Sequence, residues 1–449
     1  GRICGGGGRS AAAGPPMMPL HQVLPPSAAL TPEGHLSLGG CDVVALAAEY
    51  GTPLVIYDED AIRQAARAYR TALDAHAPGG QIIYASKAYF GQAALRLLRE
   101  EGLSVDVASG GELYAALQAG FPPERIHLHG NAKSEQELRE ALAAGVGTVI
   151  VDNLAEIATL DRLAGEVGRH QEGLVRVTPG VEASTHSYIA TGQRDSKFGF
   201  SIEGGAAEEA VARVRDSRSL VLTGLHCHIG SQLFDLSAYA AAAAILADFA
   251  ARVDGTDLAV LDMGGGLGIA YLRDERPAPI DTLVETVAAA VREEWRRVGL
   301  PQPTLMLEPG RSIVGRAGVT LYRVTSLKDI VGVRRYVAVD GGMSDLLRPM
   351  LYGASYESLI ANSADSEPNG PVRIVGKHCE SGDVIIPEAV LPEVALGDLI
   401  CVPATGAYGV AMASNYNGAT RPAVVFVSDG DARLVTRRET YADLMAREL

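Results

Sequence analysis

Residues 81–108 read QIIYASKAYFGQAALRLLREEGLSVDVA. Two apolar, β-branched runs in this stretch, Gln81–Ser86 and Leu103–Ala108, are separated by a segment with helical character. Parallel strands need a long crossover connection, usually a helix, so this unit is typical of a parallel sheet. The runs are apolar throughout and do not alternate with polar residues, which indicates strands buried on both faces.

The same unit recurs along the chain from about residue 57 to residue 315. Spacings typical of a capping box, Ser109 with Glu112 and Ser134 with Glu137, mark helix starts between the runs. Eight strand–helix units in about 250 residues predict a closed (β/α)8 TIM-like barrel, with a doubly wound open sheet as the alternative. The runs are Gln81–Ser86, Leu103–Ala108, Ile126–Leu128, Thr148–Val151, Leu174–Thr178, Val221–Cys227, Leu258–Met263 and Thr304–Leu307.

From about Leu321 onward, strand-like runs follow one another with turn residues between them and no long helices. This texture predicts a C-terminal all-β domain, a barrel or a sandwich. These runs are Tyr336–Val339, Val372–Val375, Asp383–Ile386, Leu399–Val402 and Ala423–Val427. The predicted organisation is a cloning remnant or disordered leader (1–17), an N-terminal segment that contributes to the β-domain (18–56), the barrel (57–315) and the β-domain (316–449).

The composition argues against a nucleic-acid-binding protein, a membrane protein and a metal-binding protein. The 449-residue chain has a net charge of −15, and an acidic surface disfavours nucleic-acid binding. Apolar residues make up 47% of the chain, but no run reaches the roughly 20 residues of a membrane span. The five cysteines are odd in number and show no metal-ligand spacing, which favours a reducing cytoplasm and predicts no metal site.

Active sites of β/α barrels lie at the carboxyl ends of the strands, so the residues after each run are candidates. Lys87 follows the first run, where desolvation would lower its pKa as a Schiff-base lysine requires; the alternative is a lysine that reaches solvent. Glu308 follows the eighth run in Glu308-Pro-Gly310-Arg311. A glutamate there needs a cationic or proton-bearing partner, either a pyridinium nitrogen or Arg311.

Two more strand ends offer an aromatic ring and a flexible turn. His226 and His228 fall on the same face of the sixth run, where an imidazole could stack on a planar cofactor and Ser231 could help to hold an anion. The glycines Gly264-Gly265-Gly266 follow the seventh run and would let backbone N–H groups approach an anion. Core histidines and a tight turn are the alternatives.

These strand ends together fit pyridoxal 5′-phosphate. Lys87 suits its aldehyde, His228 its ring face, Glu308 its ring nitrogen, and the glycine run its phosphate.

The segments Tyr84-Ala-Ser-Lys87-Ala, His226-Cys-His228-Ile-Gly-Ser231-Gln, Gly264-Gly-Gly and Glu308-Pro-Gly-Arg311 resemble the alanine-racemase-type barrel decarboxylases, which use this cofactor. Within that group the chain is similar to the diaminopimelate decarboxylases from about Gly51 to near its C-terminus. The pair Cys379-Glu380 separates these from ornithine-type relatives, which carry Cys-Asp, and carboxynorspermidine-type relatives, which carry Cys-Leu. The other distinguishing segments are residues 186–192, 195–199, 348–352 and 406–408.

The resemblance implies decarboxylation of meso-2,6-diaminopimelate to L-lysine and CO2, the last step of lysine synthesis. It also implies a β-domain that includes a short strand near Leu36–Gly39, and a head-to-tail homodimer. In that dimer, each site would take Cys379 and Glu380 from the partner.

It further implies roles for individual residues. Lys87 would carry the cofactor, Cys379 would return a proton, and the strand residues Asp106 and Arg176 would support the ring and its lysine. The cofactor-binding set is Lys87, His228, Ser231, Gly264, Gly265, Gly266, Glu308, Gly310, Arg311 and Tyr408. The substrate-binding set is Arg311 and Arg348 for a carboxylate, Glu380 for an ammonium group, and the hydroxyls of Tyr352 and Tyr408.

Three other functions remain open from the sequence. One is a related decarboxylase of ornithine, arginine or carboxynorspermidine, or an amino-acid racemase. Another is a non-catalytic cofactor-binding protein, and the third is a sugar-phosphate or metal-dependent barrel enzyme.

Overall fold

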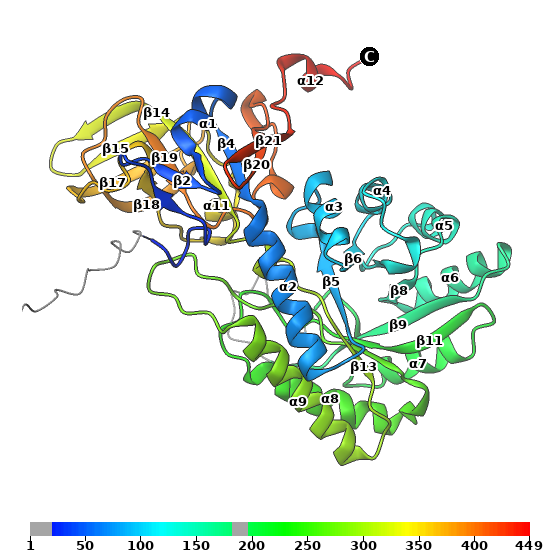
Figure 1. Cartoon of the computed structure of the whole chain (residues 1–449). Helices are drawn as coiled ribbons and strands as arrows, with labels where there is room; N and C mark the ends of the chain where they lie inside the picture. Colours follow the sequence, from blue (N-terminus) through cyan, green and yellow to red (C-terminus); the bar gives the residue numbers. More distant parts are fainter. Residues whose placement is uncertain (1–19, 182–195) are drawn as a thin grey trace, which may run out of the picture.

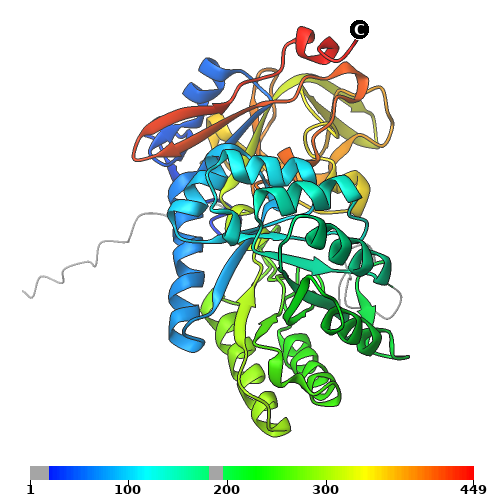
Figure 2. The ribbon, with the colours of Figure 1, turned by 90° about the vertical axis from the view of Figure 1, so that its right-hand side faces the viewer.

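The computed structural model describes residues 20–181 and 196–449. Figure 1 shows two bodies, a barrel ringed by helices and a β-domain made from both ends of the chain. The perpendicular view in Figure 2 places the β-domain across one end of the barrel.

Eight parallel strands form the barrel wall. They pair in chain order, and β13 pairs back onto β5, which closes the sheet. A short extra strand, β10 (Phe200–Ser201), extends β9 on the outside. The wall is β5 (Gln81–Ala85), β6 (Ser104–Val107), β7 (Ile126–Leu128), β8 (Thr148–Val151), β9 (Gln171–Thr178), β11 (Leu220–His226), β12 (Val260–Asp262) and β13 (Thr304–Leu307). This confirms the predicted closed barrel and excludes the open sheet.

Helices surround the wall and bury their apolar faces against it. Ser134 and Glu137 form a complete capping box at the start of α5, whereas Ser109 caps α4 without the reciprocal bond from Glu112. The carboxylate of Glu112 instead accepts from the Ala108 amide and the Ser86 hydroxyl. The ring is α2 (Glu59–His76), α3 (Gln92–Glu100), α4 (Gly110–Gln118), α5 (Glu135–Ala144), α6 (Leu154–Glu166), α7 (Ala206–Arg215), α8 (Ser237–Arg252) and α9 (Ile280–Val298).

The β-domain is built on the long strand β14 (Gly318–Ile330). One end of β14 pairs with β4 (Leu54–Asp58) and β19 (Leu399–Val402), and its other end pairs with β15 (Arg334–Val339). The remaining strands are β16 (Leu359–Ile360), β17 (Gly370–Val375), β18 (Val384–Leu391), β20 (Ala423–Ser428) and β21 (Asp431–Thr436). The five C-terminal runs predicted from the sequence all form strands.

The short N-terminal strand expected near Leu36–Gly39 is present in the β-domain, but it lies outside the main sheet. β2 (Leu36–Leu38) forms a separate small sheet with β1 (Ala29–Leu30) and β3 (Cys41–Asp42), and packs on the apolar core of the β-domain without joining its main sheet. The N-terminal strand that does join it is β4, which spans the predicted boundary at residue 57.

Short helices complete the chain: α1 (Val43–Tyr50), α10 (Arg311–Val314), α11 (Arg348–Tyr352) and α12 (Tyr441–Met445). Among the residues that the structure describes, none of the helices has the length and apolar character needed to cross a bilayer.

Candidate active site

A cavity of about 440 Å³ opens where the β-domain meets the carboxyl ends of the barrel strands. A smaller polar cavity of about 50 Å³ adjoins it, and Lys87, His228, Ser231, Arg311 and Tyr408 line both. The larger cavity also takes Arg348 and Tyr352 from α11, and the smaller one also takes Asp106, Gly266, Glu308 and Gly310. The structure therefore gathers most of the predicted site at one place.

Lys87 lies in a 3-10 turn, Ser86–Ala88, directly after β5. The turn is fixed by Ser86, whose amide donates to Asp106 (3.2 Å) and whose hydroxyl donates to Glu112 (2.9 Å). Lys87 itself is exposed at the barrel mouth. The expected desolvation of this lysine is therefore wrong for the protein without ligand, because the strand end faces an open cavity.

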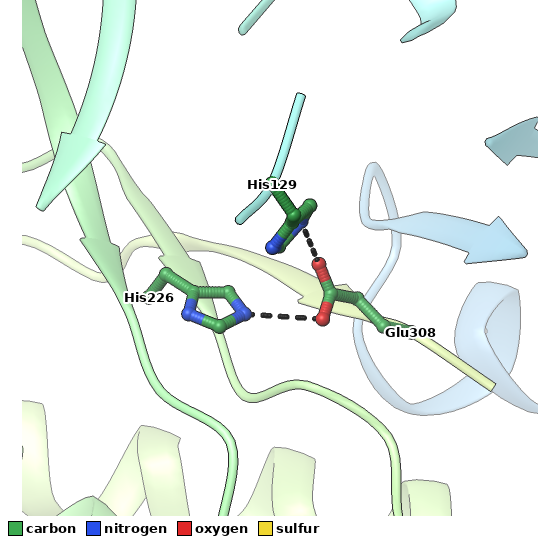
Figure 3. Close-up of side chains that lie close together, drawn as sticks. All are labelled: His129, His226 and Glu308. Atoms are coloured by element: carbon green, nitrogen blue, oxygen red, sulfur yellow. Dashed lines mark hydrogen bonds and ion pairs between the residues drawn. The ribbon is translucent and has the colours of Figure 1, made fainter. Parts of the chain in front are cut away.

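Glu308 directly follows β13 and lies buried between two histidines (Figure 3). His226 Nε2 is 3.0 Å from one carboxylate oxygen. His129 Nε2 is 2.7 Å from the other, off the line of an ideal hydrogen bond. Burial opposes the charged form, but the two imidazoles outweigh it and hold the pKa of Glu308 well below its ordinary value. Histidines, and not Arg311, are thus the protein partners of this carboxylate.

Two other carboxyl groups lie near Glu308, and both have raised pKa values. Burial raises the pKa of Asp106 to about 7, with the charge of Glu308 contributing. Burial and then the charge of Glu308 raise the pKa of Asp262 well above its ordinary value. Of these three carboxyl groups, Glu308 is therefore the one that loses its proton most readily.

His228 lines both cavities, as predicted for a ring-stacking residue. Its Nδ1 accepts the amide hydrogen of Gly265 at 3.3 Å. Burial, and next the charge of Lys87, lower the pKa of His228 well below its ordinary value, so the ring is neutral at pH 7.

The glycines Gly264, Gly265 and Gly266 allow close packing of the strand ends, in addition to the anion binding predicted from the sequence. The Gly264 amide donates to Asp262 (2.9 Å), and the Gly265 amide donates to His228. A Cβ at Gly265 would lie 2.1 Å from the carbonyl oxygen of Glu308. Of the three glycines, Gly266 alone lines the smaller cavity, and the amides of the other two donate to side chains of the protein.

Two buried arginines lie against the ring of Tyr271. Arg311 donates to the hydroxyls of Tyr271 and Ser231, the latter at 2.9 Å. Arg348 stacks over the Tyr271 ring, 4.6 Å from its centroid, and donates to the hydroxyl of Tyr356. This packing holds both guanidinium groups at the wall of the larger cavity.

Cys379 and Glu380 do not reach this cavity within their own chain. Both are exposed on the loop between β17 and β18. The Cys379 amide donates to the side chain of Asn417, and Glu380 accepts from the Gly382 amide. The single chain therefore lacks the thiol and the acid that the resemblance assigns to the site.

The side chains present fit pyridoxal 5′-phosphate. Arg311 Nε is buried with no hydrogen-bond partner in the described ranges 20–181 and 196–449, so it can still donate to an anion. Gly310 lines the smaller cavity, and a Cβ there would meet Ala85 at 2.9 Å. Glu308 supplies a carboxylate in the smaller cavity, and Lys87 supplies a primary amine to both cavities.

Sequence reasoning missed His129, Tyr271 and Tyr356. His129 directly follows β7, so the rule applied to the other strand ends would have found it. No local pattern marks the two tyrosines, which reach the site through packing with the β-domain. The predicted segment 186–192 and Asp195 lie outside the described residues.

Comparison with known proteins agrees with this geometry. Residues 59–315 match the family model described as the pyridoxal binding domain of pyridoxal-dependent decarboxylases. The diaminopimelate decarboxylase of Bacillus subtilis (strain 168) is 50% identical over 419 residues, covering 93% of this chain and 95% of the relative. That of Mycobacterium tuberculosis (strain ATCC 25618 / H37Rv) is 47% identical over 428 residues, covering 93% and 95%.

A solved structure is similar over nearly the full length. The diaminopimelate decarboxylase of M. jannaschii in complex with L-lysine superposes with a TM-score of 0.88 at 33% identity, covering 95% of this chain and 98% of that one. The fold, the gathered side chains and these likenesses agree, and the chain belongs to the diaminopimelate decarboxylase family of pyridoxal-dependent decarboxylases.

Proposed function

We propose that this chain decarboxylates meso-2,6-diaminopimelate to L-lysine and CO2 with pyridoxal 5′-phosphate. The observation that carries the proposal is the pair of adjoining cavities, lined in common by Lys87 and Arg311, which reach the buried Glu308 on one side and Arg348 on the other. A primary amine, an anionic floor and a cationic wall are what this cofactor and a substrate with two amino-acid ends require. The related structure that holds L-lysine supports the same product.

Cofactor binding would use residues of both cavities. When bound, the cofactor supplies an electron sink for the electron pair that the departing CO2 leaves behind. Lys87 would hold its carbonyl carbon covalently, and the neutral ring of His228 would pack on its face. Glu308 would hold a proton at its ring nitrogen, and Ser231, Gly266, Gly310, Arg311 and Tyr408 would surround its phosphate, with Gly264 and Gly265 as packing residues.

Substrate orientation would depend on the other wall of the larger cavity. Arg348 would bind the carboxylate of the end that does not react, because a guanidinium matches a carboxylate in two-point geometry. Tyr352 is half-buried beside it and would add a hydroxyl. A fixed far end determines which carboxylate stands perpendicular to the ring, and therefore which bond breaks.

We further propose a homodimer in which Cys379 and Glu380 of one chain complete the cavity of the other. Their exposure supports this arrangement, as does the fact that neither lines the cavities of its own chain. In the completed site the thiol would return the proton to carbon, and the carboxylate would bind the distal ammonium group. An exposed functional thiol requires a reducing compartment, which supports a cytoplasmic location.

The experiment is a turnover assay of the purified, cofactor-loaded protein with meso-diaminopimelate, beside L-ornithine and L-arginine. We expect L-lysine and CO2 in equal amounts from meso-diaminopimelate. The other two should be slower by about 10⁴-fold, because they leave the buried groups of the cavity unmatched. Comparable turnover of L-ornithine, or a racemised amino acid as product, would contradict the proposal.

A further inference from the structure

Three carboxyl groups lie close together at the carboxyl ends of β6, β12 and β13, a cluster called here the barrel floor. Asp106, Asp262 and Glu308 are all buried. Glu308 raises the pKa of both Asp106 and Asp262 through its charge. Because like charges repel strongly where the dielectric constant is low, the site favours one ionised carboxylate over three. The protein contacts decide which of the three carries the charge.

Only Glu308 is contacted by ring nitrogens on both oxygens. His226 Nε2 approaches one oxygen at 3.0 Å and His129 Nε2 the other at 2.7 Å (Figure 3). When Glu308 is ionised, a bare nitrogen lone pair so close to its oxygen would repel it, so the ionised form requires a proton on each Nε2. Asp106 accepts from the backbone amide of Ser86, and Asp262 accepts from that of Gly264. Asp262 also shares a side-chain hydrogen bond with Glu308, which favours a proton on Asp262 and the charge on Glu308.

The position of His129 is itself fixed by its surroundings. Its amide donates to the carbonyl of Val107 (2.8 Å), and its ring packs edge-on against that of His226 with centroids 4.9 Å apart. The carbonyl of the next residue, Gly130, accepts from the buried ammonium of Lys133 (2.7 Å). Lys133 also donates to the carbonyl of Ile150 and to Glu156, both at 2.7 Å. A turn anchored in this way keeps the imidazole aimed at the carboxylate.

We propose that His129 is a positioning residue that, together with His226, keeps the negative charge of the barrel floor on Glu308 and orients its carboxylate toward the cavity. The consequence for the cofactor rests on the proposed function, since the ring nitrogen is what this charge would meet. The location of the charge itself does not depend on the cofactor.

The other titratable and charged groups that face this cluster are Lys87 in the turn after β5, Asp106 on β6, His127 on β7, Arg176 on β9, Asp262 on β12, and Cys227 and His228 after β11. None of them is changed in the His129, His226 and Glu308 variants, and His127 is changed only in the control.

The first test uses the cofactor-free protein, labelled with ¹⁵N-histidine and observed by NMR at pH 7. Signals are assigned by their loss in His129→Gln and His226→Gln. We expect both rings to carry their proton on Nε2, and both Nε2–H signals to move in Glu308→Gln. A His129 ring with a bare Nε2 would overturn the proposal, whatever reaction the enzyme catalyses.

The second test compares His129→Leu, which removes the N–H donor, with His129→Gln, which restores one. The visible absorption of the pyridoxal phosphate bound to each is titrated from pH 5.5 to 9. Loss of the donor raises the pKa of Glu308, so the carboxylate gains a proton as pH falls. We expect a pH-dependent change of the band in His129→Leu and at least a tenfold weaker cofactor affinity.

The wild type and His129→Gln should give a band that is flat over the same range. His127→Leu is the matched control for loss of a buried histidine from β7, and its band should be flat as well. A flat band in His129→Leu, or a change shared by His127→Leu, would overturn the proposal even if the enzyme decarboxylates diaminopimelate. A protein that shows the expected NMR signals but fails the turnover assay would contradict only the proposed function.

Discussion

The barrel floor and the loop between β17 and β18 differ in how complete they are within one chain. On the floor, Glu308 has both oxygens occupied by histidines, and Asp262 accepts a backbone amide. On the loop, the thiol of Cys379 and the carboxylate of Glu380 are exposed. The backbone beneath that loop is nevertheless well held, since Asp383 accepts from the amides of Met343 and His378.

This difference separates two kinds of functional residue. The floor residues are paired by the fold itself, so their charge states exist before any ligand arrives. The loop residues are presented on a fixed backbone with open side chains, which suits groups that act on a neighbouring chain. The following predictions test this contrast.

The largest effect is expected from Lys87→Ala and Cys379→Ala tested separately and together. Lys87→Ala should reduce turnover by more than about 10⁴-fold and Cys379→Ala by at least about 10²-fold. If one site uses Lys87 of one chain and Cys379 of its partner, co-expressed variants form mixed dimers with one intact site. Activity should then recover to about a quarter of the wild-type value for random pairing of a symmetric dimer.

Differently tagged copies allow the mixed dimer to be purified and assayed alone. A mixed dimer no more active than its Cys379→Ala parent would contradict the shared site and would require both residues to act within one chain.

The next largest effect is the pH dependence of the free energy of unfolding that arises from ionisation of the buried Asp106. Its pKa of about 7 in the folded protein exceeds the ordinary 3.8, so the folded state binds the proton more tightly. Stability from this group is present below about pH 4 and is lost as pH rises to about 7. Asp106→Asn keeps the oxygen that accepts from Ser86 and removes the charge. We expect it to stabilise the cofactor-free protein by about 2–4 kcal/mol at pH 8.

At pH 4 the same variant should unfold at nearly the wild-type denaturant concentration, measured by chemical denaturation at both pH values. Asp216→Asn, at an exposed carboxylate after α7, is the control and should change little. Equal stabilisation by Asp106→Asn at both pH values would show that its charge is not the cause.

The smallest effect is expected at the arginine wall. Tyr356→Phe removes the hydroxyl that accepts from Arg348 and leaves the ring packing intact. Loss of one hydrogen bond to a charged group costs about 1.5 kcal/mol, so KM for meso-diaminopimelate should rise about tenfold with kcat nearly unchanged. Cofactor affinity should stay at the wild-type value; a matching loss of cofactor binding would place Arg348 at the cofactor and not at the substrate.

Much of the barrel could be predicted from the sequence, because buried parallel strands leave continuous apolar runs and the chemistry follows their ends. Lys87, His228 and Glu308 were found in this way. The strand β14 was missed because its second half, from Thr325 to Ile330, is mostly exposed and polar. The strand Leu54–Asp58, which joins the main sheet of the β-domain, was missed as well, although the short strand near Leu36–Gly39 is present.

The partners of the site residues were harder to predict because they depend on distant contacts. Arg311 was a plausible partner for Glu308 along the chain, but the fold pairs it with Ser231 and Tyr271. The glycine run was interpreted as an anion site, but two of its amides are used by Asp262 and His228. Such pairings are set by how neighbouring strands align, which local pattern does not encode.

The most direct test of the account is chemical trapping of the cofactor. Borohydride reduction of the loaded protein, followed by proteolysis and mass spectrometry, should place the phosphopyridoxyl group on the peptide that contains Lys87. Lys87→Ala should lose both the visible band and the label. A label on another lysine, or a trapped band that survives in Lys87→Ala, would contradict the assignment of this residue as the cofactor's anchor.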